Sequence, residues 1–112
     1  MNFNKELWNK ARERVKTQPE NFDWDTSWCG TRGCIAGHIC DASGTSWQMV
    51  CADSAIRLGF EDHPEMYSNY VSSIFFGHKN AGGDLVKDPN DNIAAVQAMD
   101  AFYARWRHVI EA

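Results

Sequence analysis

Apolar residues recur every three or four positions along most of the chain, which is the spacing of one face of an α-helix. The longest example lies between residues 88 and 110, and its apolar positions are Ile93, Val96, Met99, Phe102, Tyr103, Trp106, Val109 and Ile110. Residues 4–17 show the same spacing between charged residues, at Leu7, Trp8, Ala11 and Val15. We predict a helix over each segment, the first capped by Asn2 or Asn4 and ended by Pro19.

Capping residues and glycines divide the rest of the chain into three further predicted helices, over residues 31–44, 45–59 and 62–77. Thr31 is the expected N-cap of the first of these, and Pro64 is the expected first helical residue of the third. No segment alternates between apolar and polar residues with a period of two, so little or no sheet is expected. The predicted fold class is all-α, with one domain spanning the chain as a compact bundle of four to five helices.

The segment between the first two predicted helices combines Asp and Asn with three large aromatic residues, Phe22, Trp24 and Trp28. Aromatic side chains bury large areas, so we expect this aromatic-rich loop to fold back over one end of the core. Two histidines, His63 and His78, flank another predicted helix and are expected to lie in exposed loops.

Composition narrows the classes of function. The 112 residues are 44% hydrophobic and carry a net charge of −4, which argues against nonspecific nucleic-acid binding because that requires a basic surface stripe. No stretch of about 18 apolar residues occurs, so no membrane span is expected. The N-terminus lacks the apolar core of a signal peptide, which favours a cytoplasmic location. The four cysteines would there be mostly reduced thiols.

One local pattern stands out, the run over residues 28–37, which reads Trp-Cys-Gly-Thr-Arg-Gly-Cys-Ile-Ala-Gly. The accompanying pieces are Pro19, Phe22, Asp23, Phe75, Phe76 and residues 55–60. Together they resemble a family of small uncharacterised helical proteins of bacteria and their phages, over most of the chain up to about residue 76. The chain departs from that pattern at His38, where the family commonly carries an aromatic residue. The resemblance implies a compact helical fold and a phage or mobile-element origin, and it implies no activity.

The cysteines of this run allow three interpretations. If Thr31 caps a helix, Cys34 lies in the first turn, where free amides and the helix dipole can lower a thiol pKa. Cys34 and His38 would lie one helical turn apart on the same face of that helix, and Cys29 would lie in the turn just before the helix begins. The cysteines can be packing residues, or they can bind zinc with Cys51 as a further ligand, although paired Cys-x-x-Cys spacings are absent. A third interpretation is a reactive thiolate at Cys29 or Cys34, with His38 as the general base, which would suit acyl transfer or redox exchange.

No complete catalytic constellation is apparent, so the favoured function is not enzymatic and involves no cofactor. We expect a small accessory protein, encoded by a phage or mobile element, that binds a host protein in the cytoplasm. A thiol- or zinc-dependent site and a self-associating structural protein are the alternatives. Trp24, Tyr67 and Tyr103 would be suitable interface anchors where they are exposed. The candidate binding residues are Cys29, Gly30, Thr31, Cys34, His38, Trp24 and Trp28.

Overall fold

The computed structural model describes residues 1–44, 47–75 and 88–112 of the chain. Within them lie five α-helices: α1 (Lys5–Thr17), α2 (Ile35–Ala42), α3 (Val50–Leu58), α4 (Pro64–Tyr70) and α5 (Asn92–Ile110). A 3-10 turn, η1 (Pro19–Asn21), follows α1, and a π-helical turn, η2 (Val71–Phe75), continues α4. These residues contain no strand and one isolated bridge, between Phe22 and Gly33. The predicted all-α fold is therefore confirmed.

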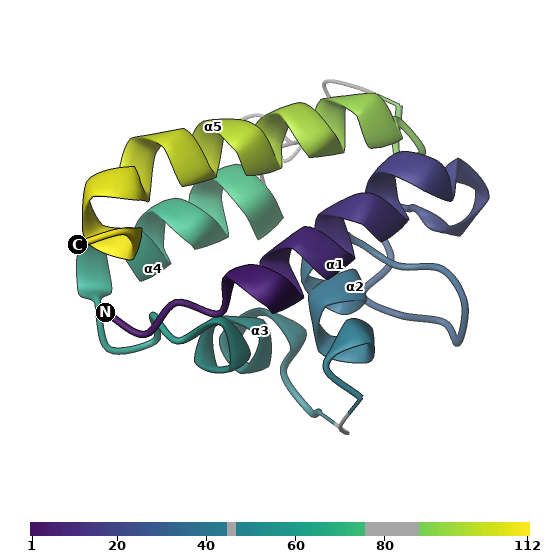
Figure 1. Cartoon of the computed structure of the whole chain (residues 1–112). Helices are drawn as coiled ribbons and strands as arrows, with labels where there is room; N and C mark the ends of the chain where they lie inside the picture. Colours follow the sequence, from purple (N-terminus) through teal and green to yellow (C-terminus); the bar gives the residue numbers. More distant parts are fainter. Residues whose placement is uncertain (45–46, 76–87) are drawn as a thin grey trace.

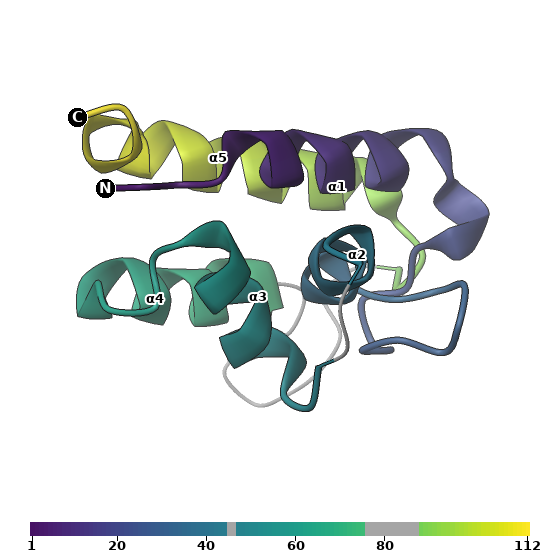
Figure 2. The ribbon, with the colours of Figure 1, turned by 60° about the horizontal axis from the view of Figure 1, so that its bottom comes forward.

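The helices form two layers. Figure 2 shows α1 and α5 together in one layer and α2, α3 and α4 in the other. The two chain ends lie at the same end of the molecule (Figure 1), where the Lys5 ammonium is 3.4 Å from the Glu111 carboxylate. At the opposite end, the segment between η1 and α2, drawn in blue, extends beyond the helices in both views.

Helix α1 follows the sequence prediction closely. The Asn4 side chain caps it by accepting the Leu7 amide at 3.0 Å, and Pro19 follows its last turn. Its buried residues are the predicted Leu7, Trp8, Ala11 and Val15. A large apolar side chain stabilises the fold by about 1.5–3 kcal/mol when it is fully buried, so this stripe holds α1 on the core.

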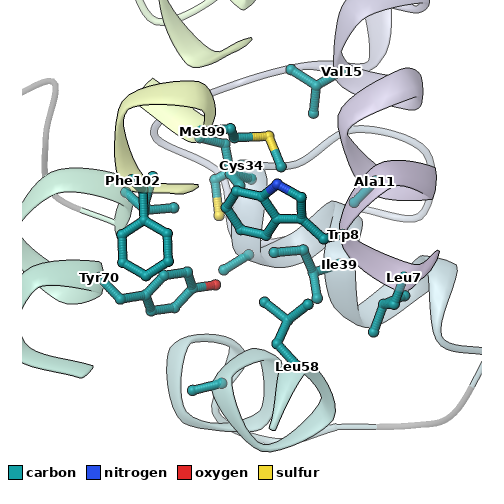
Figure 3. Close-up of a cluster of buried hydrophobic side chains, with 14 of the residues drawn as sticks. Leu7, Trp8, Ala11, Val15, Cys34, Ile39, Leu58, Tyr70, Met99 and Phe102 are labelled. Atoms are coloured by element: carbon teal, nitrogen blue, oxygen red, sulfur yellow. The ribbon is translucent and has the colours of Figure 1, made fainter. Parts of the chain in front are cut away.

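The core lies between the two layers (Figure 3). Trp8 of α1, Tyr70 of α4 and Phe102 of α5 meet there, and the Trp8 and Phe102 ring centroids are 5.7 Å apart. The Tyr70 hydroxyl is buried with them and shares a 2.5 Å hydrogen bond with the Ser54 hydroxyl. Because a buried polar group is costly without a partner, this bond accounts for a tyrosine and a serine at the centre of an apolar core.

Three helix starts differ from the predictions, and in two of them an unforeseen side chain caps the helix. Helix α2 begins at Ile35 because Cys34, not Thr31, is its N-cap. Helix α5 begins after Asp91, whose carboxylate accepts the Ala94 amide at 3.0 Å. Helix α3 begins at Val50, later than predicted. The sequence also offers Thr45 or Ser46 as the cap of the helix predicted over residues 45–59. That cap, the predicted helix end at residue 77 and the loop position of His78 lie outside the described residues.

The prediction for His63 is wrong in part. This residue is half-buried and is the N-cap of α4, where its Nδ1 accepts the Met66 amide at 3.2 Å. Its ring also packs against Trp106, with centroids 5.5 Å apart. Pro64 is the first helical residue, as predicted.

No helix in the described part of the chain is both long enough and apolar enough to cross a membrane.

Candidate functional site

The segment that extends beyond the helices is residues 21–34, which we call the loop (Figure 2). The motif of residues 28–37 forms its second half and continues into α2. Backbone hydrogen bonds close it at its base. The Gly33 amide donates to the Asn21 carbonyl at 3.1 Å, and the Asp23 amide donates to the Gly33 carbonyl at 3.0 Å. A third hydrogen bond joins the last residue of the loop to its first half: the Cys34 amide donates to the Thr26 carbonyl at 2.7 Å. The loop is thus held in one conformation by its own backbone.

Four consecutive residues at the end of the loop, Cys29, Gly30, Thr31 and Arg32, are exposed, and we call them the tip. The Cys29 amide donates to the Arg32 carbonyl at 2.9 Å and closes the tip. Gly30 has φ 99°, a left-handed conformation in which side chains are strained, and nothing lies within 4 Å of a Cβ placed there. The tip therefore needs a glycine for its backbone conformation alone.

The other two glycines of the motif serve a different purpose. A Cβ on Gly33 would lie 2.6 Å from the Ser27 carbonyl oxygen and 2.5 Å from the Trp28 ring. A Cβ on Gly37 would lie 1.8 Å from the same oxygen. Because no side chain fits in these spaces, both glycines let the Ser27–Trp28 backbone lie directly against α2.

Two tryptophans fasten the loop to the helices. Trp24 is 3% exposed, and its indole N–H donates to the Asp91 carbonyl at the start of α5, at 3.2 Å. It is therefore a structural anchor and not the exposed interface residue that the sequence allowed. Trp28 is half-buried, with the Arg14 guanidinium 5.8 Å from its ring and Trp47 at 6.4 Å between centroids. One face of the loop is thus tied to α1 and to the α2–α3 connection.

His38 lies inside the molecule, beneath the loop. It is fully buried, its Nε2 lies 2.8 Å from the Asn21 carbonyl oxygen, and its ring packs edge to face with Trp28 at 5.2 Å. Burial lowers the pKa of His38, and the nearby Arg14 charge lowers it further, while the hydrogen bond to Asn21 opposes both. The neutral imidazole is the form that this environment favours.

The expected activation of the Cys34 thiol is contradicted. Cys34 is the N-cap of α2, and its Sγ lies 3.5 Å from the Gly37 amide, but the side chain is 2% exposed and lies among Trp8 and Met99 in the core (Figure 3). Burial raises the pKa of Cys34, and the hydrogen bonds from backbone amides only partly oppose that rise. Desolvation thus outweighs the helix N-terminus, and the thiol is held neutral.

The predicted zinc ligands are not brought together. Cys29 is exposed at the tip, whereas Cys34 and His38 are buried, and Cys51 is half-buried on α3. Among the residues that the structure describes, no group of three or more His, Cys, Asp or Glu side chains could hold a metal ion. All four thiols, Cys40 included, are free, and burial raises the pKa of Cys40 to about 11.

The candidate residues divide into two sets. Cys29, Gly30 and Thr31 are presented to solvent, together with Arg32, which the sequence reasoning did not single out. The other set supports them and consists of the buried Trp24, Cys34 and His38 and the half-buried Trp28. We call these residues, together with Gly33 and Gly37, the frame. Gly33 and Gly37 lack the Cβ that would prevent close backbone approach, and their presence in the motif is the sequence signal for the frame.

Two hollows in the surface lie away from the loop. One, of about 440 Å³, is lined by Asn4, Glu6, Leu7, Lys10, Ala42, Ser43 and Arg57. The other, of about 480 Å³, is lined by Pro64, Glu65, Ser68, Asn69, Ser72, Arg105 and Trp106. Neither hollow includes a residue of the motif. The loop therefore contributes to neither of these two pockets, and it presents a projecting surface instead.

No protein-family model, curated protein or solved structure matches this chain. The candidate site is therefore interpreted from its own geometry.

Proposed function

We propose that this chain is a small accessory protein that binds a protein partner through the tip, Cys29–Arg32. One observation carries the proposal: four exposed residues are presented by a loop whose base, both tryptophans and two glycines are packed against the helices. None of the backbone and ring contacts described above is needed merely to connect α1 to α2. A short connection between two helices would suffice for that purpose.

A rigid projecting loop is suited to recognition. Binding residues are commonly carried on loops that a rigid scaffold positions. A loop whose backbone is already ordered loses less conformational entropy on association than a disordered one. The tip offers a thiol, a hydroxyl and one guanidinium, which suits a mixed polar protein surface. The net charge of −4 argues against a nucleic-acid partner, because nonspecific binding to nucleic acid requires a basic surface stripe.

The partner is proposed to be a host protein, with the chain encoded by a phage or mobile element. This part of the proposal is supported by the sequence resemblance of residues 28–37 and not by the geometry of the loop.

Site-specific photocrosslinking tests the proposal. Benzoylphenylalanine is placed at position 31 in the tip, and in a matched control at the exposed position 104 of α5. We expect a discrete heterologous adduct from position 31 in cells that contain the partner, and none from position 104. Equal labelling from both positions would overturn the proposal, and a crosslinked second copy of the chain would replace it with self-association.

A pair of glycine variants then separates conformation from stability. Gly30 and Gly44 both have positive φ, 99° and 78°, and a Cβ on either would meet nothing within 4 Å. Gly30→Ala and Gly44→Ala therefore introduce the same backbone strain, about 1 kcal/mol each, without a clash. We expect Gly30→Ala to weaken binding of the captured partner at least tenfold and Gly44→Ala to leave it unchanged. Equal effects of the two would show that the tip conformation is not recognised.

A further inference from the structure

His38 of α2 contacts the loop through a hydrogen bond to the Asn21 carbonyl oxygen. The Asn21 carbonyl oxygen accepts two hydrogen bonds, from the Gly33 amide at 3.1 Å and from His38 Nε2 at 2.8 Å. Because a carbonyl can only accept, Nε2 carries the proton, and the neutral ring leaves Nδ1 unprotonated. The same ring packs against Phe22 and Trp28, with centroids 6.4 Å and 5.2 Å away. The His38 imidazole thus contacts both the beginning of the loop, at Phe22, and its later part, at Trp28.

A second proton on this ring would have no acceptor within the described structure. Nδ1 is buried and has no hydrogen-bond partner among the described residues. Two charged groups act on the ring: Arg14 of α1 disfavours the imidazolium, and Asp41 of α2 favours it. They are bonded to each other at 2.6 Å, so the Asp41 carboxylate is already compensated. The loop groups that contact the ring, the Asn21 carbonyl and the Phe22 and Trp28 rings, are all uncharged.

We propose that His38 is an acid-sensitive latch, whose protonation releases the loop from α2. A buried imidazolium without an acceptor is strongly disfavoured, and it becomes stable once water reaches it. His38 is carried by a helix of the core, whereas Phe22 and Trp28, which cover the ring, belong to the loop. The loop is therefore the element that moves, and the hydrogen bonds at the Asn21 carbonyl break as it does. One proton from solvent binds Nδ1 of His38, and no other covalent bond forms or breaks.

Hydrogen exchange of the full chain, measured by NMR between pH 7.5 and 5.0, tests the latch without any partner. The reporters are the Gly33 and Cys34 amides, which donate to Asn21 and Thr26 within the loop. After correction for the intrinsic pH dependence of exchange, the opening constant should rise about tenfold for each pH unit below about 6.5, because opening takes up one proton. A pH-independent opening constant over this range would overturn the proposal.

Two variants and one internal signal identify the group responsible. His38→Gln keeps an N–H donor but cannot titrate, so its opening constant should not change with pH. His108→Gln removes an exposed histidine of α5 and should behave as the unmodified protein does. In the unmodified protein, the His38 ring Cε1 proton signal should shift only at the lower pH at which the open, protonated form becomes substantially populated. If His38 titrates while Gly33 and Cys34 stay protected, the latch is refuted, even if His38→Gln does not fold. Because loop opening is read without a partner, its failure would leave the proposed binding function standing.

Discussion

Substitution of Gly37 by alanine separates two physical effects that predict opposite signs. Gly37 lies within α2, where alanine is favoured over glycine by about 0.8–1.0 kcal/mol in helix propensity. Its Cβ would, however, lie 1.8 Å from the Ser27 carbonyl oxygen. That carbonyl would have to retreat by roughly 1.6 Å to restore ordinary contact, which is 3.4 Å or more. Overpacking of this kind costs typically about 1–3 kcal/mol.

Displacement of Ser27 would also strain the hydrogen bond between the Cys34 amide and the Thr26 carbonyl, which measures 2.7 Å. A hydrogen bond of this type contributes about 0.5–1.5 kcal/mol. After the gain in helix propensity is subtracted, we expect Gly37→Ala to destabilise the protein by about 2 kcal/mol.

Urea unfolding at pH 7.5, followed by far-ultraviolet circular dichroism, measures this change in free energy. Gly30→Ala is the control, because it makes the same chemical change in the adjoining loop but in open space, and should cost only about 1 kcal/mol. A Gly37→Ala variant as stable as the unmodified protein, or more stable, would show that the loop does not lie against α2 as described.

Three further predictions follow from other contacts. Burial lowers the pKa of His38, so the unfolded chain binds a proton at a higher pH than the folded protein does. The free energy of unfolding should therefore be at its full value above about pH 6.5 and fall by up to about 1.4 kcal/mol for each pH unit below it. Urea unfolding of His38→Gln should show a smaller fall. A double-mutant cycle of Tyr70→Phe and Ser54→Ala should give a coupling of about 1 kcal/mol in urea unfolding, and additive effects would contradict the buried hydrogen bond. Arg12→Ala removes a two-pronged ion pair with Asp100 that is partly exposed, so thermal and urea unfolding should change by less than about 1 kcal/mol.

The helices of this chain could be predicted where local signals and tertiary packing agree. The apolar stripe of α1 and its Asn4 cap were predicted as the structure has them. In α5 the stripe was only partly right, since Ile93 is 57% exposed and Ala95 is buried in its place. Ile93 lies in the first turn of α5 and faces solvent. A periodic sequence pattern shows which residues share a helix face, but it cannot show where the helices that cover that face end.

The candidate site was harder to predict because burial, not spacing, decides the role of each residue. Thr31 has a good capping side chain, yet the tip holds it in solvent and Cys34 caps α2. The position of Cys34 at a helix start suggested an activated thiol, but its desolvation depends on Trp8 and other residues distant in sequence. The glycines of the motif have structural reasons: Gly33 and Gly37 are needed for contact with Ser27, and Gly30 for the tip conformation.

Residue-by-residue hydrogen exchange of the loop at pH 7.5 tests the central claim most directly, that an exposed tip stands on a packed frame. The account predicts strong protection of the Gly33 and Cys34 amides, which are bonded within the frame, and near-unprotected exchange at Gly30 and Thr31. Uniformly fast exchange from residue 29 to residue 34 would contradict it, because the tip would then have no frame to hold it.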